Sequence, residues 1–384
     1  MVAPGAIGVA AFRAQLAEGR SGIAVIDRFD TAGLTAHKAA LLRDFNPREF
    51  ISPGKMRRMN NLSRSGLSAA RLAVQDSGNA ALDQSTGVAI GTSFGPVQTS
   101  VEYMEEYVAK GASLAPPQLF AESVANAPGS HIAIDLDLRG FNITITQRES
   151  SVLAAAMYAA SQIVKGAAPA ALIGGVEEVN EMLFSVIDRI GALAHGDDEN
   201  SRPFDRRRNG MVIGEGGAMF IAGGSAPPQA YFSGFGIARD ITASVSDWGT
   251  EHEAVVRAMR AAIDDAGIAT ADVDAVYASA NSTVRADRLE ARAINALFGA
   301  QIPVVAAKGI FGEYAAGGAL QLAAAVLAIA DQNLHPSVGF AERDEEIDIA
   351  VNGSLRKMAL RHIVVNSVSA GGGIVSAVLS REPA

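Results

Sequence analysis

The sequence predicts a layered α/β fold built from two similar halves. Short apolar runs bounded by glycine or proline alternate with amphipathic helical patterns along almost the whole chain, which is typical of largely parallel sheets covered by helices. A unit of helix, glycine and strand also occurs in both halves. With 384 residues, of which 49% are hydrophobic, the chain can bury a large core.

The repeated unit is clearest in two segments. Residues 64–78 form an amphipathic pattern that ends at a glycine and precedes the apolar run TGVAIGTS, and residues 253–267 do the same before VDAVYASANST. Such units recur in any α/β protein, so the pattern leaves duplication and chance recurrence equally open. We expect the halves to comprise residues 1–224 and 225–384, joined near residues 222–234.

The composition excludes several classes of function. The chain contains no cysteine, which removes disulfides, thiolate metal ligands and any sulfur nucleophile. A formal net charge of -9 argues against a nucleic-acid binder, which needs a basic face for phosphates. No apolar run is long enough to span a membrane, and the opening MVAPGAIGVAAFRAQL lacks the features of a secretory signal. We therefore expect a globular, cytoplasmic protein.

Neither the glycine clusters nor the histidines indicate a cofactor or metal site. Residues 214–224 lack the order of a dinucleotide fingerprint and the Lys-Ser/Thr of a P-loop, so they predict a tight turn leading into a buried strand. The histidines are scattered, with no pair at the helical spacing of zinc ligands: His37, His131, His195, His252, His335 and His362. We expect no cofactor and no metal.

One corner of the sequence raises a question of chemistry. Residues 143–178 give a β-like run, a charged corner, a helix of small residues and a second apolar run closed by Gly174-Gly175. Corners of this kind often carry a nucleophile at the helix start, yet here the position holds Glu149. Ser150 and Ser151 follow it, and without a base beside them they are interpreted as small helix-start residues.

Several motifs resemble the β-ketoacyl-acyl-carrier-protein synthase family of the thiolase fold, in family order and over nearly the whole chain. The most specific is SRPFDRRRNGMVIGEGGAMFI, at residues 201–221. The others are GKMRRMNNLSRSGLSAARLAVQDSG, GVAIGTSFG, LRGFNITI, ALIGGVEE, DRLEARAINALFG, AAKGIFGEYAAGGALQLAAA and NSVSAGGG. The resemblance implies an α-β-α-β-α sandwich of two thiolase-like halves.

The family's chemistry needs a cysteine at a buried helix start, two histidines that help to decarboxylate a malonyl unit, and backbone N–H groups that hold an oxyanion. Matching the motifs places five residues at the family's cysteine, first histidine, second histidine, lysine and gating phenylalanine: Glu149, Ser279, Glu313, Lys308 and Ala370. The oxyanion-hole positions are Glu149 and Ala370. A slip of one residue would put Arg148 at the cysteine position, and neither residue can form an acyl thioester.

These substitutions predict a plugged pocket. Burying Glu149 and Glu313 unpaired is costly, so we expect either an ion pair centred on Lys308 or a raised pKa on one acid. A carboxylate at Glu313 would also repel the carbanion-like transition state of decarboxylation. An acid–base pair acting on another substrate is the less favoured alternative.

The resemblance leaves three functions open. The favoured one is a non-catalytic, chain-length-factor-like subunit of fatty acid or polyketide biosynthesis, which forms a homodimer or pairs with an active ketosynthase and serves an acyl carrier protein. The alternative is a carrier-dependent enzyme of altered chemistry, malonyl decarboxylation or another acyl transfer, that uses Glu149, Glu313 and Lys308. The third is a product of gene decay that folds poorly. Whether the chain catalyses any reaction stays open.

Acyl carrier proteins are acidic, so basic segments are candidate docking sites. Two segments supply such residues: Lys55, Arg57, Arg58 and Arg64 in the first, and Arg206, Arg207 and Arg208 in the second. Surface arginines are more often solvated or paired within the fold, which is the favoured interpretation.

The start of the chain departs from the family pattern. MVAPGAIG resembles the turn that members reach after a first β-strand, so we expect that strand to be missing from the centre of the first sheet. Its loss would leave unpaired ladder groups, which suggests a mis-assigned start.

Overall fold

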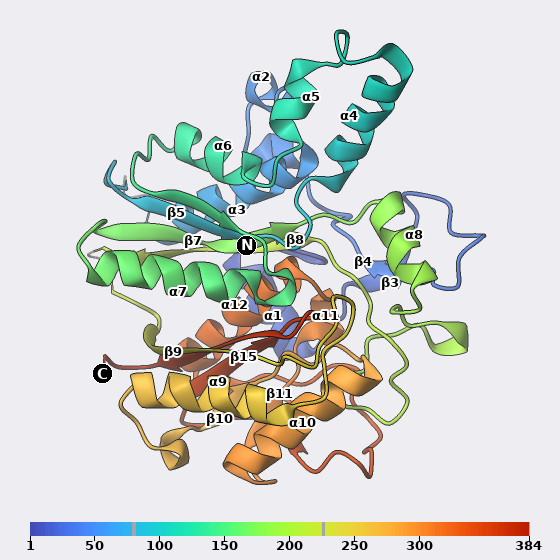
Figure 1. The fold of residues 1–384 in the computed structure, drawn as a ribbon. Helices are drawn as coiled ribbons and strands as arrows, with labels where there is room; N and C mark the ends of the chain where they lie inside the picture. The colour runs from blue at the N-terminus through green and yellow to red at the C-terminus, as the bar shows by residue number, and fades with distance from the viewer. Residues whose placement is uncertain (79–81, 225–226, 384) are drawn as a thin grey trace.

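Two six-stranded sheets, one from each half of the chain, form the framework of the structure (Figure 1). It is a computed structural model that describes residues 1–78, 82–224 and 227–383. In spatial order the first sheet contains β2 (Ala6–Ile7), β1 (Val2–Ala3), β8 (Gly216–Gly223), β7 (Ala170–Glu177), β5 (Gly87–Gly91) and β6 (Asn142–Ile145). The second contains β13 (Ala350–Val351), β11 (Pro303–Val305), β10 (Ala275–Tyr277), β15 (His362–Val368), β16 (Gly373–Ser380) and β9 (Tyr231–Arg239). Two small ribbons pair β3 (Ile23–Val25) with β4 (Lys38–Ala40) and β12 (Asn333–Leu334) with β14 (Arg356–Lys357).

Helices cover both outer faces of the sheets and fill the space between them (Figure 1). The outer helices on the first sheet are α3 (Asn61–Asp76) and α6 (Ala127–Asp135), and those below the second are α9 (His252–Asp265) and α10 (Val284–Phe298). The central layer holds α7 (Ser151–Val164) and α12 (Ala315–Asp331). The remaining helices are α1 (Val9–Glu18), α2 (Pro53–Met56), α4 (Val97–Lys110), α5 (Pro117–Glu122), α8 (Glu181–Arg189) and α11 (Lys308–Phe311). The predicted α-β-α-β-α architecture is confirmed.

The two sheets repeat one topology. The order β1-β8-β7-β5-β6 in the first matches β9-β16-β15-β10-β11 in the second, and in each the first two pairings are antiparallel and the last two parallel. The halves are therefore duplicated, as the sequence pattern suggested. Their division at residues 224 and 225 stays a prediction, since residues 225 and 226 lie outside the described part of the chain.

The elements predicted from the repeated pattern are present. The helix expected at residues 64–78 is α3, which begins at Asn61 because the Asn60 side chain accepts a hydrogen bond from the Ser63 N–H at 2.6 Å. The helix expected at residues 253–267 is α9, and each is followed by its strand, β5 or β10. The glycine-rich segment supplies β8, whose first half is buried, as predicted. The tight turn expected before it is wrong, because Gly214 forms a parallel bridge with Ala40 instead.

The start of the chain forms a two-residue strand, β1, of which Val2 pairs with Gly217 of β8. Among the described residues β8 has no second strand partner from Ala218 onward, so the expected loss of a longer first strand stays a prediction. The central position expected for the first strand is wrong for β1, which lies next to the edge of the sheet, between β8 and β2.

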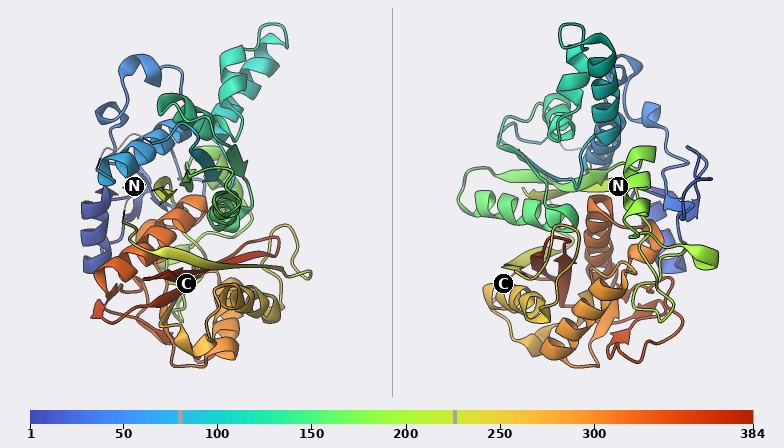
Figure 2. Two further views of the ribbon diagram at one scale, coloured as in Figure 1. Left: turned by 90° about the vertical axis from the view of Figure 1, so that its left-hand side faces the viewer. Right: turned by 45° about the vertical axis from the view of Figure 1, so that its right-hand side comes forward.

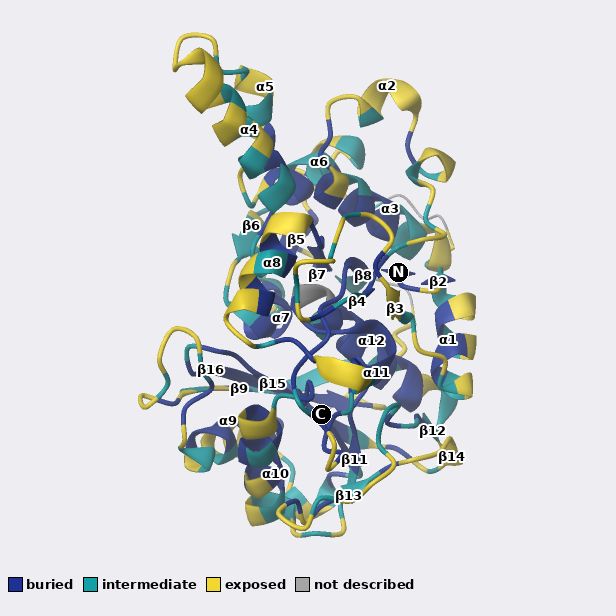
Figure 3. Cartoon of the chain, turned by 90° about the vertical axis from the view of Figure 1, so that its right-hand side faces the viewer, coloured by how far each residue is buried: buried dark blue, intermediate teal, exposed yellow. Residues whose placement is uncertain are grey.

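Helices α4 and α5 form an arm that projects from the body of the molecule (Figures 1 and 2). Colouring by burial shows that most of this arm is exposed (Figure 3). Its exposed side chains include several large apolar ones: Met104, Tyr107, Val108, Leu114 and Phe120. None of the helices in the described part of the chain is both long and apolar enough to cross a membrane.

Candidate functional site

The first wall of the site is the corner between β6 and α7. After β6 a single 3-10 turn, Arg148–Ser150, leads into α7, with Arg148 in the left-handed region at φ 48°. The Ser151 hydroxyl accepts the Gln147 N–H at 2.8 Å and donates to the Arg148 carbonyl at 2.6 Å, which closes the turn. The corner therefore holds Glu149 buried at the start of the central helix, where the helix dipole favours an anion.

The second wall is the equivalent corner of the other half. Helix α11 ends at Phe311, Gly312 and Glu313 follow, and Tyr314 at φ 83° turns the chain into α12. Tyr314 is buried and packs edge-on against Phe94, with ring centroids 5.0 Å apart. The Tyr314 N–H donates to the Glu313 carboxylate at 2.8 Å, which places this acid at the start of the other central helix.

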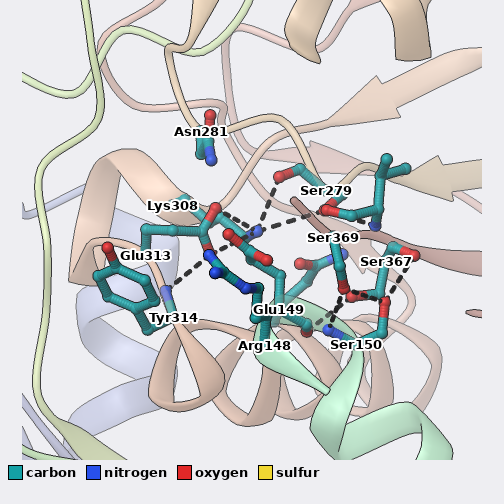
Figure 4. Close-up of polar contacts among 12 residues, drawn as sticks. Arg148, Glu149, Ser150, Ser279, Asn281, Lys308, Glu313, Tyr314, Ser367 and Ser369 are labelled. Carbon is teal, nitrogen blue, oxygen red and sulfur yellow. Dashed lines mark hydrogen bonds and ion pairs between the residues drawn. The ribbon is translucent and has the colours of Figure 1, made fainter. Parts of the chain in front are cut away.

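Lys308 and Glu313 form a buried ion pair (Figure 4). The Lys308 Nζ lies 2.7 Å from Glu313 Oε1 and 2.8 Å from Oε2, and both side chains are at most 2% exposed. Nζ also donates to the Ser279 carbonyl at 2.7 Å. The predicted Lys308-centred ion pair is confirmed, and its partner is Glu313.

Glu149 forms no ion pair with any described residue. Its Oε2 accepts the Ala370 N–H at 3.1 Å, and its own backbone N–H also bonds the carboxylate. Burial, followed by the charge of Glu313, raises the pKa of Glu149 to about 7, against the lowering effects of Lys308 and Arg148. Both outcomes predicted for the acids therefore occur, an ion pair on Glu313 and a raised pKa on Glu149.

Three serines join the first corner to the second half. The Ser150 N–H donates to Ser369 Oγ at 2.9 Å, the two hydroxyls lie 2.7 Å apart, and the Ser367 hydroxyl donates to the Glu149 carbonyl at 2.7 Å (Figure 4). Ser150 is thus a packing residue at the helix start, as interpreted from the sequence. Ser367 and Ser369 were missed, because they stand in a distant strand and loop whose approach to α7 no local pattern indicates.

Ser279 belongs to the same cluster. Its N–H donates to Glu290 Oε1 at 2.8 Å, and its hydroxyl accepts the Val368 N–H at 3.0 Å. Glu290 also accepts the Asn366 amide at 2.7 Å, and burial raises the pKa of Glu290 to about 7. The Ser279 hydroxyl also accepts a hydrogen bond from Lys308 Nζ at 3.4 Å, and no imidazole or carboxylate accepts its proton within the described chain.

The arrangement is a cluster of two acids and two basic residues. Lys308 pairs with Glu313, and Arg148 extends alongside Glu149 with no ion pair within 4 Å in the described part of the chain (Figure 4). Carboxylates, a lysine and backbone-bonded serines supply no activated nucleophile. Across the described residues no group of three or more histidines and acids is arranged to hold a metal ion.

The two basic segments differ in their surroundings. Arg57, Arg58 and Arg64 line a cavity of about 230 Å³ beside the start of α3. In the second segment Arg207 pairs with Asp205 at 3.1 Å and with Glu342 at 3.2 Å. Two further members of the segments are paired as well, Lys55 with Asp135 and the buried Arg208 with Asp344. Pairing within the fold, the favoured interpretation, thus holds for Lys55, Arg207 and Arg208.

A duplicated fold whose two central helices start at one shared polar pocket defines a thiolase-like α/β protein. Comparison with known families agrees: residues 1–224 match the β-ketoacyl synthase N-terminal domain, and residues 229–341 match its C-terminal domain. The chain belongs to the β-ketoacyl synthase family.

Relatives and solved structures are similar over nearly the full length. The chain is 30% identical to a 3-oxoacyl-acyl-carrier-protein synthase 2 of Coxiella burnetii, covering 95% of this chain and 93% of that protein. It is also 30% identical to a putative polyketide β-ketoacyl synthase 1 of Streptomyces halstedii, covering 100% and 96%. The solved structure of the ishigamide ketosynthase/chain length factor is 28% identical, with a TM-score of 0.90 over 99% of this chain and 96% of that one.

Proposed function

We propose that this chain is a non-catalytic, chain-length-factor-like subunit that pairs with an active ketosynthase in fatty acid or polyketide biosynthesis. The observation that carries the proposal is the bond from the Ala370 N–H to the Glu149 carboxylate. By resemblance, this N–H belongs to the group that binds the substrate oxyanion in active members. The chain's own acid therefore takes the substrate's place.

The residues around this bond support the same conclusion. The chain contains no cysteine, and Glu313 stands at the second histidine position, neutralised by Lys308. Ser279 stands at the first histidine position, and its hydroxyl accepts a hydrogen bond from the Val368 N–H. A pocket that holds neither thiolate nor imidazole cannot form an acyl thioester or stabilise a malonyl carbanion as the family does.

The exposed apolar side chains of the projecting arm are a second argument for a partner subunit. Val108 is 78% exposed, Leu114 67% and Phe120 58%, and apolar side chains gathered on one projection mark protein-binding surfaces. The outer edge of β6 is also open, since β6 pairs with β5 alone among the described strands. We propose that the arm and this edge contact the active ketosynthase.

Carrier docking is proposed at the first basic segment. Arg57, Arg58 and Arg64 gather at one cavity, and Arg57 and Arg58 have no carboxylate partner within the described chain. An acidic carrier protein would meet unpaired cations there. In the second segment Arg206 is exposed while Arg207 is paired, so that segment offers less free charge.

Co-expression with an intact Cys-His-His ketosynthase tests the proposal. We expect a heterodimer that elongates acyl thioesters, whereas this chain alone neither condenses acyl groups nor releases carbon dioxide from malonyl-carrier protein. A double variant Val108→Glu/Leu114→Glu should abolish pairing, while Val164→Glu, an exposed apolar residue at the end of α7, serves as the matched control.

The alternative of an altered enzyme has its own signature. If the isolated chain released carbon dioxide or transferred an acyl group, and Glu149→Gln lost that activity while keeping the fold, the site would be catalytic. Elongation by the chain without any partner would overturn the proposal outright.

A further inference from the structure

The arm leaves the body of the molecule where two parallel strands end side by side. β5 and β7 are in register, with Gly91 opposite Gly175. The chain after β5 forms the start of the arm, residues 92–98, whereas β7 ends in Glu177 and is followed by Glu178. Because the two strand ends are neighbours, these two acids face the segment from which the arm projects.

Both acids hold the start of the arm through backbone N–H groups. The Glu177 carboxylate accepts the Ser93 N–H at 2.6 Å and also accepts the Phe94 N–H. The Glu178 carboxylate accepts the Gln98 N–H at 3.0 Å, in the first turn of α4. These bonds fix the path of the main chain where the arm begins.

The two acids are buried and have no ion-pair partner among the described residues. Glu177 is 1% exposed and Glu178 is 7% exposed. Arg28 faces Glu178, but its guanidinium bonds Glu215 through two nitrogens, at 2.7 and 2.8 Å. The arginines of the first basic segment share a cavity with Glu178, yet none lies within 4 Å of its carboxylate. Burial without a paired cation favours the protonated form of an acid.

Further acidic groups face the pair. Glu177 is faced by Glu178 and Tyr314, and Glu178 is faced by Glu102 and Glu215. Since Glu102 belongs to α4, ionised Glu178 and Glu102 would repel each other across the start of the arm. Burial raises the pKa of Glu177 to about 8 and the pKa of Glu178 to about 7, so both acids change charge near neutral pH.

The arm returns to the body close to the point where it leaves. At the return, the Glu122 carboxylate accepts the Asn60 N–H at 3.1 Å and bonds the His131 imidazole at 2.8 Å. Gly95, at φ 72°, lies against Ala125, and a Cβ added at this glycine would come within 3.2 Å of the Ala125 Cα. Because the two ends of the arm meet here, its position depends on the contacts at this one place.

We propose that Glu177 and Glu178 form a proton-dependent latch at the start of the arm. In their protonated form they hold α4 and α5 in the position that contacts the partner subunit, and their ionisation above neutral pH releases the start of the arm. In the released position both carboxyl groups reach water, where such groups are ionised at neutral pH. This regulation rests on the proposed function, because it acts on the surface assigned to the partner.

Hydrogen exchange of the isolated chain measures the latch without any partner. Because the held state binds more protons than the released state, rising pH favours release. Protection of residues 92–98, corrected for the intrinsic exchange rate at each pH, should fall at least about tenfold between pH 6 and pH 8.5. Residues 252–265 of α9 should keep their protection, which excludes global unfolding. Equal protection of residues 92–98 at both pH values would overturn the proposal.

The double variant Glu177→Gln/Glu178→Gln replaces both acids with neutral side chains of the same shape. It should keep its protection at pH 8.5, because the amides accept the same N–H groups and stay uncharged. Glu105→Gln is the matched control, since it removes an exposed charge from α4 away from the latch and should lose protection as the parent chain does. A double variant that loses protection as much as the parent chain would overturn the proposal. The pH series on the parent chain decides the question even where the double variant does not fold.

Pairing with an active ketosynthase separates the latch from the proposed function. Relative to the double variant, the parent chain should bind the ketosynthase at least about tenfold more weakly at pH 8.5 than at pH 6. Equal pH dependence of pairing for both chains would overturn the latch and leave the proposed function standing. Absence of pairing at every pH would overturn the proposed function, and the exchange series would then decide the latch alone.

Discussion

Glu149 in the first half and Glu313 in the second occupy equivalent corners of the duplicated fold. Each stands at the start of a central helix, α7 or α12, and each adjoins a residue with positive φ, Arg148 at 48° and Tyr314 at 83°. In the first corner the chain turns from β6 into α7, and in the second it turns from α11 into α12. The duplication therefore brings two acids into one pocket.

The two corners hold their acids differently. The Glu313 carboxylate forms an ion pair with Lys308 Nζ at 2.7 Å, whereas the Glu149 carboxylate accepts hydrogen bonds from backbone N–H groups alone. Lys308 precedes Glu313 by five residues in its own half, and the first half supplies Arg148, which forms no ion pair with Glu149 in the described structure. Glu313 is therefore neutralised by its ion pair, whereas the raised pKa of Glu149 lets that acid keep its proton below about pH 7.

Removing the lysine should have the largest effect on stability of all the changes considered. In Lys308→Met the Glu313 carboxylate stays buried without a counter-charge, and breaking a buried ion pair costs about 3–5 kcal/mol. We expect a loss of that size in the free energy of unfolding at neutral pH, measured by urea denaturation.

The double variant Lys308→Met/Glu313→Gln is the control, because it removes both charges. It should recover most of the lost stability. A single variant as stable as the parent chain would show that the ion pair contributes nothing, and the difference between the corners would then lie elsewhere.

The pH dependence of stability should distinguish Glu149 from the paired Glu313. The pKa of Glu149 is raised to about 7 in the folded chain from its ordinary 4.5, so the folded state binds more protons between these values. Stability from this group is therefore lost as the pH rises from about 4.5 to about 7, by a total approaching 3 kcal/mol.

Glu149→Gln isolates this contribution. The glutamine can still accept the Ala370 N–H but carries no charge, so the variant should match the parent chain near pH 5 and exceed it in stability at pH 8. Other buried acids titrate in the same range, for example Glu177 with a pKa raised by burial to about 8, and they cancel in the difference. Parallel stability curves for the two proteins would refute the assignment.

Local sequence carried the fold, because glycine-bounded strands and amphipathic segments are short-range patterns, and they predicted α3, β5 and α9. The placement of Glu149 and Lys308 in one pocket came from the family resemblance, because the two residues lie far apart in the sequence. The central position expected for the first strand was wrong, since β1 lies beside β2 near the edge of the sheet.

The family resemblance brought Glu149 and Ala370 to one site, but the individual bonds between the halves were beyond the sequence. Ser369 meets Ser150 across 219 positions, and the bond from Ala370 to Glu149 spans 221, so their geometry depends on how the two sheets stack.

The serine contact between the halves should have an intermediate effect. In Ser369→Ala the buried N–H of Ser150 keeps the Gln147 carbonyl at 3.1 Å but loses Ser369 Oγ at 2.9 Å, and the Ser150 hydroxyl loses its partner at 2.7 Å. Together these losses cost about 1–2 kcal/mol in unfolding free energy. Ser130→Ala is the matched control, since that hydroxyl bonds back to its own helix at Asn126. Equal melting temperatures for the two variants would show that the halves are not joined through this contact.

The smallest effect is expected at an exposed contact between the halves. Arg207, in the first half, pairs with Glu342 in the second at 3.2 Å and with Asp205 at 3.1 Å, but exposed ion pairs are screened by water. Asp205 keeps two backbone donors from the second half, the Ala341 and Glu342 N–H groups at 2.7 Å each, so its carboxylate stays satisfied without the guanidinium. Arg207→Ala should therefore leave the melting temperature unchanged at moderate salt, and a marked drop would show that surface charge, as well as the buried serines, holds the halves together.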